Sequence, residues 1–119
     1  MAELALSRTV SGHLPPVGEY PAALSQTNAP RWALHADFSL AHARMRAERG
    51  DTIGTVGQVA KAVVEMAHGV ACQRRMWVLN EKKLIERAGL QDLHAAFVDV
   101  PRSPAELVAW VERFRAWES

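Results

Sequence analysis

Aromatic and apolar positions recur every three or four residues in the first long stretch of the chain, between residues 30 and 48. The side chains at this spacing are Trp32, His35, Phe38, His42 and Met45. On an α-helix such a spacing places them on one face and leaves the charged residues elsewhere. We therefore expect a helix that runs to about Glu48 and packs this face on a neighbour.

A second run of apolar positions predicts another long helix, from Thr52 to Trp77. Its members are Val56, Val59, Val63, Met66, Ala67 and Val70. A helix of about 26 residues is close to 39 Å long at about 1.5 Å per residue, which suits the spine of a bundle. Gly50 suits the end of the first helix, and the Asp51 carboxylate suits the cap of the second.

Proline and glycine residues divide the N-terminal part of the chain. Residues 1–19 contain prolines and glycines without a sustained period, which predicts an extended lead-in. A short helix is expected over residues 20–28, because Pro21 is tolerated in a first turn. Pro30 then suits the first turn of the longer helix.

Capping signals predict the helices of the C-terminal part. Asn80 is a good N-cap for a short third helix, and residues 90–100 are expected to form another. Ser103 and Glu106 make a capping box with Pro104 at the first helical position, which predicts a final helix. The side chains expected to face inward from this helix are Leu107, Trp110, Val111 and Phe114.

These patterns predict an all-α fold, because no segment carries a hairpin signal or strand-like alternation. We expect an antiparallel four-helix-type bundle over residues 20–119, with a short N-terminal helix and an extended lead-in. Of the 119 residues, 49% are hydrophobic and 23% are charged, and the net charge is +1. This composition fits one globular domain and gives no electrostatic reason to expect nucleic-acid binding.

Cysteine usage and the length of the apolar runs bear on the compartment. Cys72 is the single cysteine, so it makes no disulfide within the chain, and the N-terminus lacks the long apolar core of a secretory signal. Lys61, Glu65 and His68 interrupt the most apolar segment, well short of the ~20 apolar residues of a membrane span. We expect a cytoplasmic protein without a membrane partner.

Glu65, His68 and Cys72 form the tightest group of chemically active side chains on one predicted helix. Their spacing of i, i+3 and i+7 allows one face to bind a metal or to pair a thiol with an imidazole. The alternative is ordinary helix packing, since buried cysteines are common and no second metal-binding pair follows.

Two arginine patterns allow contact with RNA. Arg87 and His94 fit a loose Arg-x(4-6)-His spacing like that of helical ribonucleases, although the five histidines of the chain make a chance match easy. Arg74, Arg75 and Trp77 have the residue types of a phosphate-binding and stacking patch. At a net charge of +1 the alternative is a solvated arginine pair beside a buried tryptophan.

Three segments carry a resemblance to a known family. They are "YPAAL" at 20–24, "FSLAHARMRAERGD" at 38–51 and "WVLNEKKLIERAGL" at 77–90. In this order and spacing they are similar to the helical C-terminal half of bacterial nucleotidyltransferases, the superfamily of kanamycin nucleotidyltransferase. In those proteins a catalytic domain with a Gly-Ser motif and an Asp-x-Asp pair comes first. This chain has no Asp-x-Asp, GxSxG, GxGxxG or Walker-type motif.

The resemblance implies a set of substrate-binding positions. Residues 49–51 match the turn between the long helices, and residues 80–82 match an Asn-Glu-Lys motif after the second. Lys61 stands where arginine is expected in the relatives, and "CQRRMW" replaces a more apolar segment. The carboxylates would hold hydroxyl or amino groups and the cations would neutralise phosphates. The implied residues are Arg49, Asp51, Lys61, Asn80, Glu81 and Lys82.

The resemblance predicts a helical substrate-binding or accessory domain that works with a separate nucleotidyltransferase catalytic chain. No cofactor is expected in this chain; Mg²⁺ and a nucleoside triphosphate would come only with the catalytic partner. Two alternatives stay open. One is a small helical (HEPN-like) ribonuclease or RNA-binding toxin component that uses Arg87 and His94. The other is an interaction module that forms a homodimer through the faces of Trp32, Phe38 and Trp110.

Overall fold

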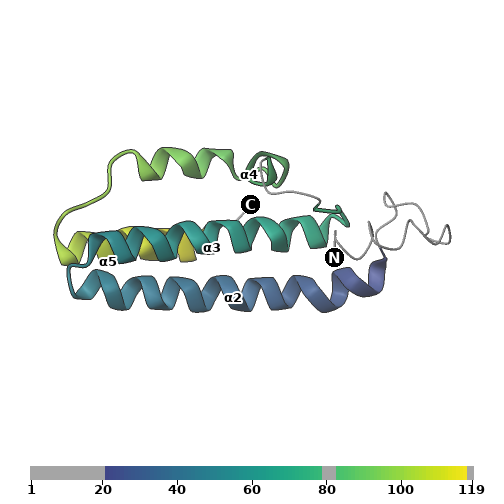
Figure 1. The fold of residues 1–119 in the computed structure, drawn as a ribbon, viewed down its shortest axis with the longest axis horizontal. Helices are drawn as coiled ribbons and strands as arrows, with labels where there is room; N and C mark the ends of the chain where they lie inside the picture. Colours follow the sequence, from purple (N-terminus) through teal and green to yellow (C-terminus); the bar gives the residue numbers. More distant parts are fainter. Residues whose placement is uncertain (1–20, 79–82, 118–119) are drawn as a thin grey trace, which may run out of the picture.

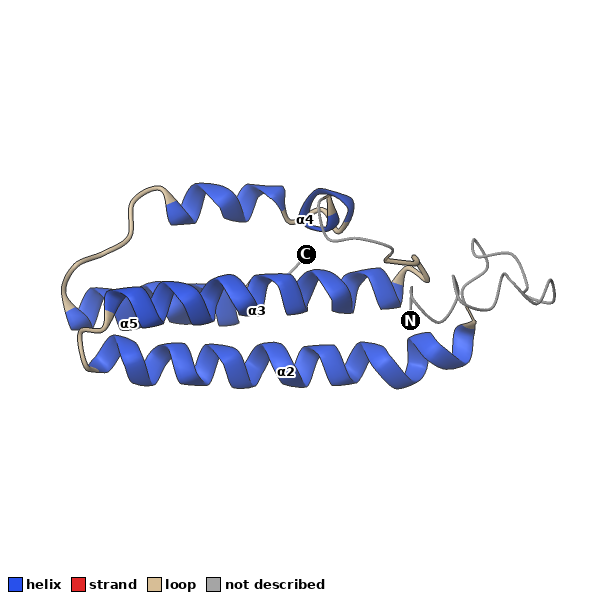
Figure 2. Ribbon diagram, viewed as in Figure 1, coloured by secondary structure: helices blue, strands red, loops and turns tan. Residues whose placement is uncertain are grey.

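A computed structural model of the chain describes residues 21–78 and 83–117. In these residues the elements are α2 (Ala22–Glu48), α3 (Thr52–Gln73), α4 (Leu84–Arg87), the 3₁₀ helix η2 (Gln91–Phe97) and α5 (Pro104–Arg115). The described part contains helices and no strand, so the predicted all-α fold is confirmed (Figure 2). The expected lead-in over residues 1–19 lies outside the described residues.

The long helices α2 and α3 lie antiparallel and side by side (Figure 1). The chain then returns along α3 through α4 and η2, and we call residues 84–97 the strap. Helix α5 runs antiparallel to α2 and packs mainly against it. The bundle is elongated, because α2 and α3 are much longer than the other helices and run along its length.

Helix α2 crosses the position where the sequence predicts a boundary between two helices. Pro30 lies inside it, about two turns from its start. A proline in a helix interior removes one backbone hydrogen bond, at a cost of about 3 kcal/mol. Asn28 and Ala29, on the N-terminal side of Pro30, are partly buried and line grooves shared with α3.

The prediction that the aromatic face of α2 packs on a neighbour holds for Trp32, which stacks on His68 of α3, and is wrong for Phe38 and Met45. Phe38 and Met45 are exposed by 56% and 51%. The buried positions of α2 are Ala36, Ser39, Leu40, Ala43 and Ala47. They face buried small residues of α3 such as Ala62 and Ala67, and small side chains allow two helices to approach closely. Alanines therefore make up much of the core between the two helices.

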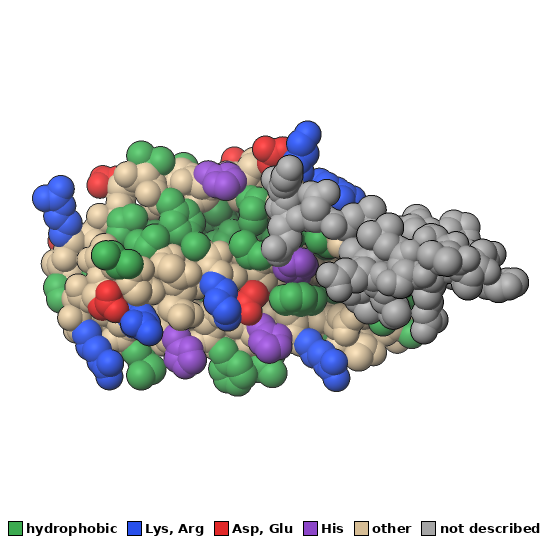
Figure 3. All heavy atoms as spheres, in the orientation of Figure 1, with side chains coloured by type: hydrophobic (Ala, Val, Ile, Leu, Met, Phe, Trp, Pro, Cys, Tyr) green, Lys and Arg blue, Asp and Glu red, His purple; other side chains and the backbone are tan. Residues whose placement is uncertain are grey.

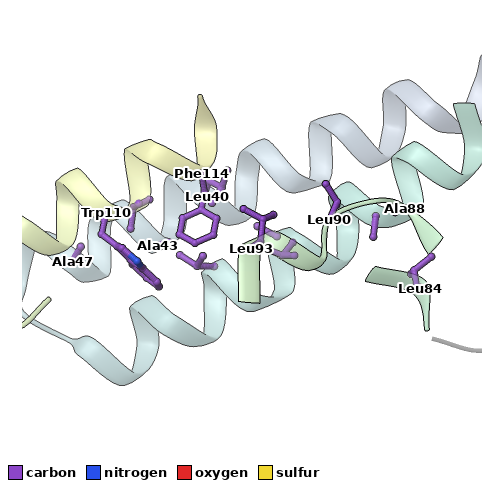
Figure 4. Close-up of a cluster of buried hydrophobic side chains, with 14 of the residues drawn as sticks. Leu40, Ala43, Ala47, Leu84, Ala88, Leu90, Leu93, Trp110 and Phe114 are labelled. Atoms are coloured by element: carbon purple, nitrogen blue, oxygen red, sulfur yellow. The ribbon is translucent and has the colours of Figure 1, made fainter. Parts of the chain in front are cut away.

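The predicted inward face of α5 is confirmed. Trp110 and Phe114 contact Phe97 of η2, with centroid distances of 5.5 Å from Phe97 to each ring. The indole Nε1–H of Trp110 donates to the carbonyl of Ala96 at 3.0 Å. Figure 4 shows Trp110 and Phe114 among the buried side chains of the core. This aromatic cluster fixes the end of the strap to α5.

Most of the predicted capping is present in the described residues. Ser103 Oγ accepts a hydrogen bond from the backbone N–H of Glu106 at 3.2 Å, and Asp51 Oδ1 accepts one from Gly54 at 2.9 Å. The Gly54 N–H, together with Arg46, lowers the pKa of the Asp51 carboxyl. The predicted cap residue Asn80 lies outside the described residues. The helix expected over residues 90–100 is the shorter 3₁₀ helix η2.

Three helices end in the same backbone motif, in which one residue adopts a left-handed conformation. That residue is Gly50 after α2, Gly89 after α4 and Arg75 after α3, with φ of 73°, 76° and 54°. At the end of α3 the Met76 N–H donates to the carbonyl of Ala71 at 2.8 Å, as in a Schellman motif. Helix α3 therefore stops at Gln73, four residues before the predicted end.

Two glycines of α3 should respond to alanine in opposite directions. A Cβ at Gly54 would overlap Asp51 Oδ2 and lie 2.7 Å from Arg46 Cδ, whereas a Cβ at Gly57 meets nothing within 4 Å. We expect Gly57→Ala to stabilise the protein by roughly 0.5–1 kcal/mol, the helix-propensity gain. Gly54→Ala should lower the Tm, because it disrupts the Asp51 cap. Thermal unfolding followed by circular dichroism tests both, and a raised Tm for Gly54→Ala would contradict this role of the cap.

Candidate functional site

A buried carboxylate joins α2 to α3 near the middle of the bundle. Ser39 Oγ donates to Glu65 Oε1 at 2.5 Å. Lys61 Nζ donates to Ser39 Oγ at 3.0 Å and contacts Glu65 Oε2 at 3.4 Å. The Glu65 side chain is 10% exposed and the Lys61 side chain 61% exposed. This polar cluster (Ser39, Lys61 and Glu65) therefore connects the core to solvent.

The polar cluster borders a groove of about 400 Å³ between α2 and α3, lined by Asn28, Arg31, Trp32, His35 and Glu65. The four α2 residues recur at intervals of one, three or four positions, so they share one side of the helix. Trp32 stacks on His68 of α3, with centroids 4.3 Å apart and planes at 12°. Charged and imidazole side chains gather on this face of α2 and α3 (Figure 3).

The groove has the residue types of a binding site for a polar ligand. The Glu65 carboxylate accepts hydrogen bonds, so it suits hydroxyl or amino groups. Arg31 lines the groove and Lys61 lies beside it through its contact with Glu65. Both are exposed cations that suit phosphate or carboxylate groups. Trp32 lines the groove, and His68 of α3 stacks on one face of its ring, which fixes the orientation of the indole. These contacts bind and orient a ligand.

The metal site considered for Glu65, His68 and Cys72 is not formed. Glu65 turns toward Ser39 and Lys61, His68 stacks on Trp32 and Cys72 is buried. Within residues 21–78 and 83–117 no group of three or more His, Cys, Asp or Glu side chains could hold a metal ion. Helix packing therefore accounts for this spacing.

The structure separates the site residues implied by the family resemblance. Arg49 and Asp51 lie at the turn between α2 and α3, where Asp51 caps α3 and pairs with Arg46 at 3.0 Å. Lys61 lies ten residues further along, about 15 Å up the helix axis. Residues 80–82, the Asn-Glu-Lys motif with Asn80, Glu81 and Lys82, lie outside the described residues. In the described residues the Lys61 side chain contacts Ser39 and Glu65, not Asp51.

Sequence analysis missed Ser39 and the groove side chains of α2 as site residues. Ser39 carries the one available signal, because it is a polar residue in the buried series that contains Ala36, Leu40 and Ala43. A buried hydroxyl needs a hydrogen-bond partner. The partner could not be read from the sequence, because Glu65 lies 26 residues away.

The residues of the ribonuclease alternative face different surroundings. Both Arg87 and His94 are exposed, on α4 and η2. His94 lines an apolar groove of about 220 Å³ with Ile85 and Phe97, and Arg87 is not among its lining residues. The carbonyl of Arg87 accepts a hydrogen bond from Arg74 at 3.5 Å. No described contact joins the two side chains in one cleft.

Comparisons with protein-family models, with curated proteins and with solved structures give no match to this chain. Among the described residues no helix has both the length and the apolar character needed to cross a membrane. The site therefore has to be interpreted from its own side chains and from the sequence resemblance.

Proposed function

We propose that this chain is a helical substrate-binding or accessory domain of a nucleotidyltransferase system, with catalysis supplied by a separate chain. The observation that carries the proposal is the polar cluster, which places a buried carboxylate and a lysine beside an open groove. The three segments that resemble nucleotidyltransferases support it, and two of them contribute to α2 and the turn that follows.

Burial of Glu65 is more easily explained by binding than by stability. Taking a carboxylate out of water is costly, and replacing a buried ion pair with apolar residues is often neutral or stabilising. Lys61 is largely exposed, so it compensates the charge only in part. The alanines that α2 and α3 bury on either side of this cluster show that apolar packing is available at the same interface. We therefore assign Glu65 to ligand recognition.

The roles follow from charge. Lys61 and Arg31 would contact phosphate groups, and Glu65 would accept hydrogen bonds from hydroxyl or amino groups of the acceptor. Mg²⁺ and the nucleoside triphosphate would arrive with the catalytic chain, whose Asp-x-Asp pair would hold the metal. This chain would contribute one wall of the acceptor cleft and orient the acceptor.

Calorimetric titration with MgATP tests the phosphate-binding part of the proposal. We expect measurable binding to the wild type and a Kd at least about tenfold higher for Lys61→Ala, the loss of one charged contact. Arg102→Ala removes a positive charge from an exposed loop position and should bind like the wild type. Circular dichroism confirms that the variants are folded.

Glu65→Gln separates the phosphate-contacting role of the cations from the role of the Glu65 carboxylate. It keeps hydrogen-bonding atoms near Ser39 but removes the negative charge, so MgATP affinity should be equal or higher. Equal binding by the wild type and Lys61→Ala would contradict the proposal. Absence of MgATP binding to the wild type would contradict the phosphate-contacting roles of Lys61 and Arg31, and would leave an accessory or interaction domain that needs a separate catalytic chain.

A further inference from the structure

The face of α2 that points away from the bundle core carries a continuous apolar stripe. Its members are Leu34, Phe38, Ala41 and Met45, which we call the outer stripe. Leu34, Phe38 and Met45 are the exposed large hydrophobic residues of α2, each with about half of its surface in solvent. Hydrophobic side chains project along the lower edge of the molecule, where Figure 1 places α2 (Figure 3).

The outer stripe repeats the spacing of the buried face of the same helix. Its positions follow intervals of four, three and four residues, as do the buried positions Ala36, Leu40, Ala43 and Ala47. The two series are offset by two residues, or about 200° around a helix of 3.6 residues per turn. Alternating intervals of four and three residues are the a and d positions of a coiled-coil seam. Helix α2 therefore has one seam for the bundle and a second seam opposite to it.

We propose that the outer stripe binds a second copy of this chain, through an antiparallel α2–α2 contact. In one register Leu34 faces Met45 of the second copy, and Phe38 faces Ala41. A large ring then lies against a small side chain, as interdigitating layers require. Because a two-fold axis relates the copies, each of these contacts occurs twice. The stripe is thus complementary to itself.

Charge supports the same register. Arg31 and Glu48 continue the seam at its two ends, and this alignment places Arg31 of one copy against Glu48 of the other. Asp37 and Arg44 lie along one edge of the seam and also meet with opposite charge. All four side chains are exposed. Asp37 and Arg44 have partners on α5, so a second copy would extend existing ion pairs. A parallel, in-register arrangement would instead place like charges together.

The expected contact covers residues 31–48 of one helix in each copy. A single helix pair of this length buries less surface area than a standard stable interface, which covers about 1,200 Å² or more. We therefore expect a reversible dimer whose population depends on protein concentration. The same register brings Arg49 of the second copy beside Asn28, at the rim of the groove. The dimer itself does not depend on the proposed ligand.

Sedimentation velocity over a wide concentration range tests the dimer. The wild type should shift from monomer to dimer as concentration rises. Phe38→Asp should raise the dissociation constant at least about tenfold, because it places two carboxylates near the two-fold axis. Ala41→Leu should also raise it, because a large side chain opposite Phe38 overfills the layer in which a ring lies against a small residue. Ile53→Asp, a matched change at an exposed apolar residue of α3, should leave it unchanged.

Charge reversal tests the register. Arg31→Glu should weaken the dimer, and adding Glu48→Arg in the same chain should restore part of the affinity. Circular dichroism at low concentration confirms folding of each variant. A wild type that stays monomeric, or a dimer that survives Phe38→Asp, would overturn the proposal. A dimer lost in Phe38→Asp without rescue by the double charge reversal would overturn the antiparallel register.

Discussion

Trp110→Ala should destabilise the protein by about 3–5 kcal/mol, the usual cost of truncating a buried aromatic side chain. The Trp110 ring is buried between Phe97 and Phe114, and its Nε1–H donates to the carbonyl of Ala96. The change removes apolar contacts from two elements and leaves that carbonyl without its indole partner. Because domains of this size are stable by only about 5–15 kcal/mol, a large fraction of the stability should be lost.

Urea unfolding followed by far-ultraviolet circular dichroism measures this cost without relying on tryptophan fluorescence. Trp110→Phe provides a graded variant, because it keeps a ring but removes the hydrogen bond, and should cost less. Trp117→Ala is a control at a partly exposed tryptophan two residues beyond the end of α5. If Trp110→Ala and Trp117→Ala lowered the unfolding free energy equally, the aromatic cluster would not be the anchor of the strap.

Leu90→Ala should destabilise the protein by about 2–5 kcal/mol. Leu90 lies between α4 and η2, is fully buried and belongs to the same cluster of buried side chains as Leu40 (Figure 4). The strap has one helical turn in α4 and a short 3₁₀ helix, so its local hydrogen bonds contribute little. Its attachment should depend on a few buried side chains, of which Leu90 is among the largest.

Val98→Ala is the matched control for Leu90→Ala, since Val98 lies just after the strap and is 86% exposed. It should change the unfolding free energy by less than about 0.5 kcal/mol, as surface substitutions do. Chemical denaturation of both variants measures the difference. A cost for Leu90→Ala no larger than for Val98→Ala would mean that the strap is held by other contacts.

Local signals predicted the end of α2 and the starts of α3 and α5. The Ser103 cap on the Glu106 N–H, the left-handed Gly50 and the Asp51 cap all involve residues within a few positions of one another. Backbone groups at a helix end need partners, and the side chain that supplies one lies nearby. The end of α3 was missed because Arg75 takes the left-handed position that glycine usually occupies.

The partner of each face of α2 could not be predicted in the same way. Its large residues, such as Phe38 and Met45, and its alanines, such as Ala43 and Ala47, follow one spacing on opposite sides. Hydrophobicity favours the large residues, whereas close helix contact favours the small ones. Which face of α2 packs against α3 depends on the side chains that α3 presents, and those are distant from α2 in the sequence.

The contacts of the candidate site also join residues that are distant in the sequence, so they could not be predicted either. Lys61 and Glu65 are four residues apart on one helix, a spacing that by itself indicates only an ion pair on the helix surface. Their connection to Ser39 depends on how α2 and α3 align, and it turns a surface pair into a partly buried cluster. The implied residues Arg49 and Asp51 were grouped with Lys61 by resemblance, but the length of α3 separates them.

The short turn between α2 and α3 has a consequence for how the chain reaches its structure. Only residues 49–51 separate the two longest helices, so their contact closes with a small loss of chain entropy. Proteins rich in such sequence-local contacts fold quickly. We expect the α2–α3 hairpin to form the folding transition state, with the strap and α5 docking afterwards. The cost of Leu90→Ala or Trp110→Ala would then appear as faster unfolding, with the refolding rate nearly unchanged.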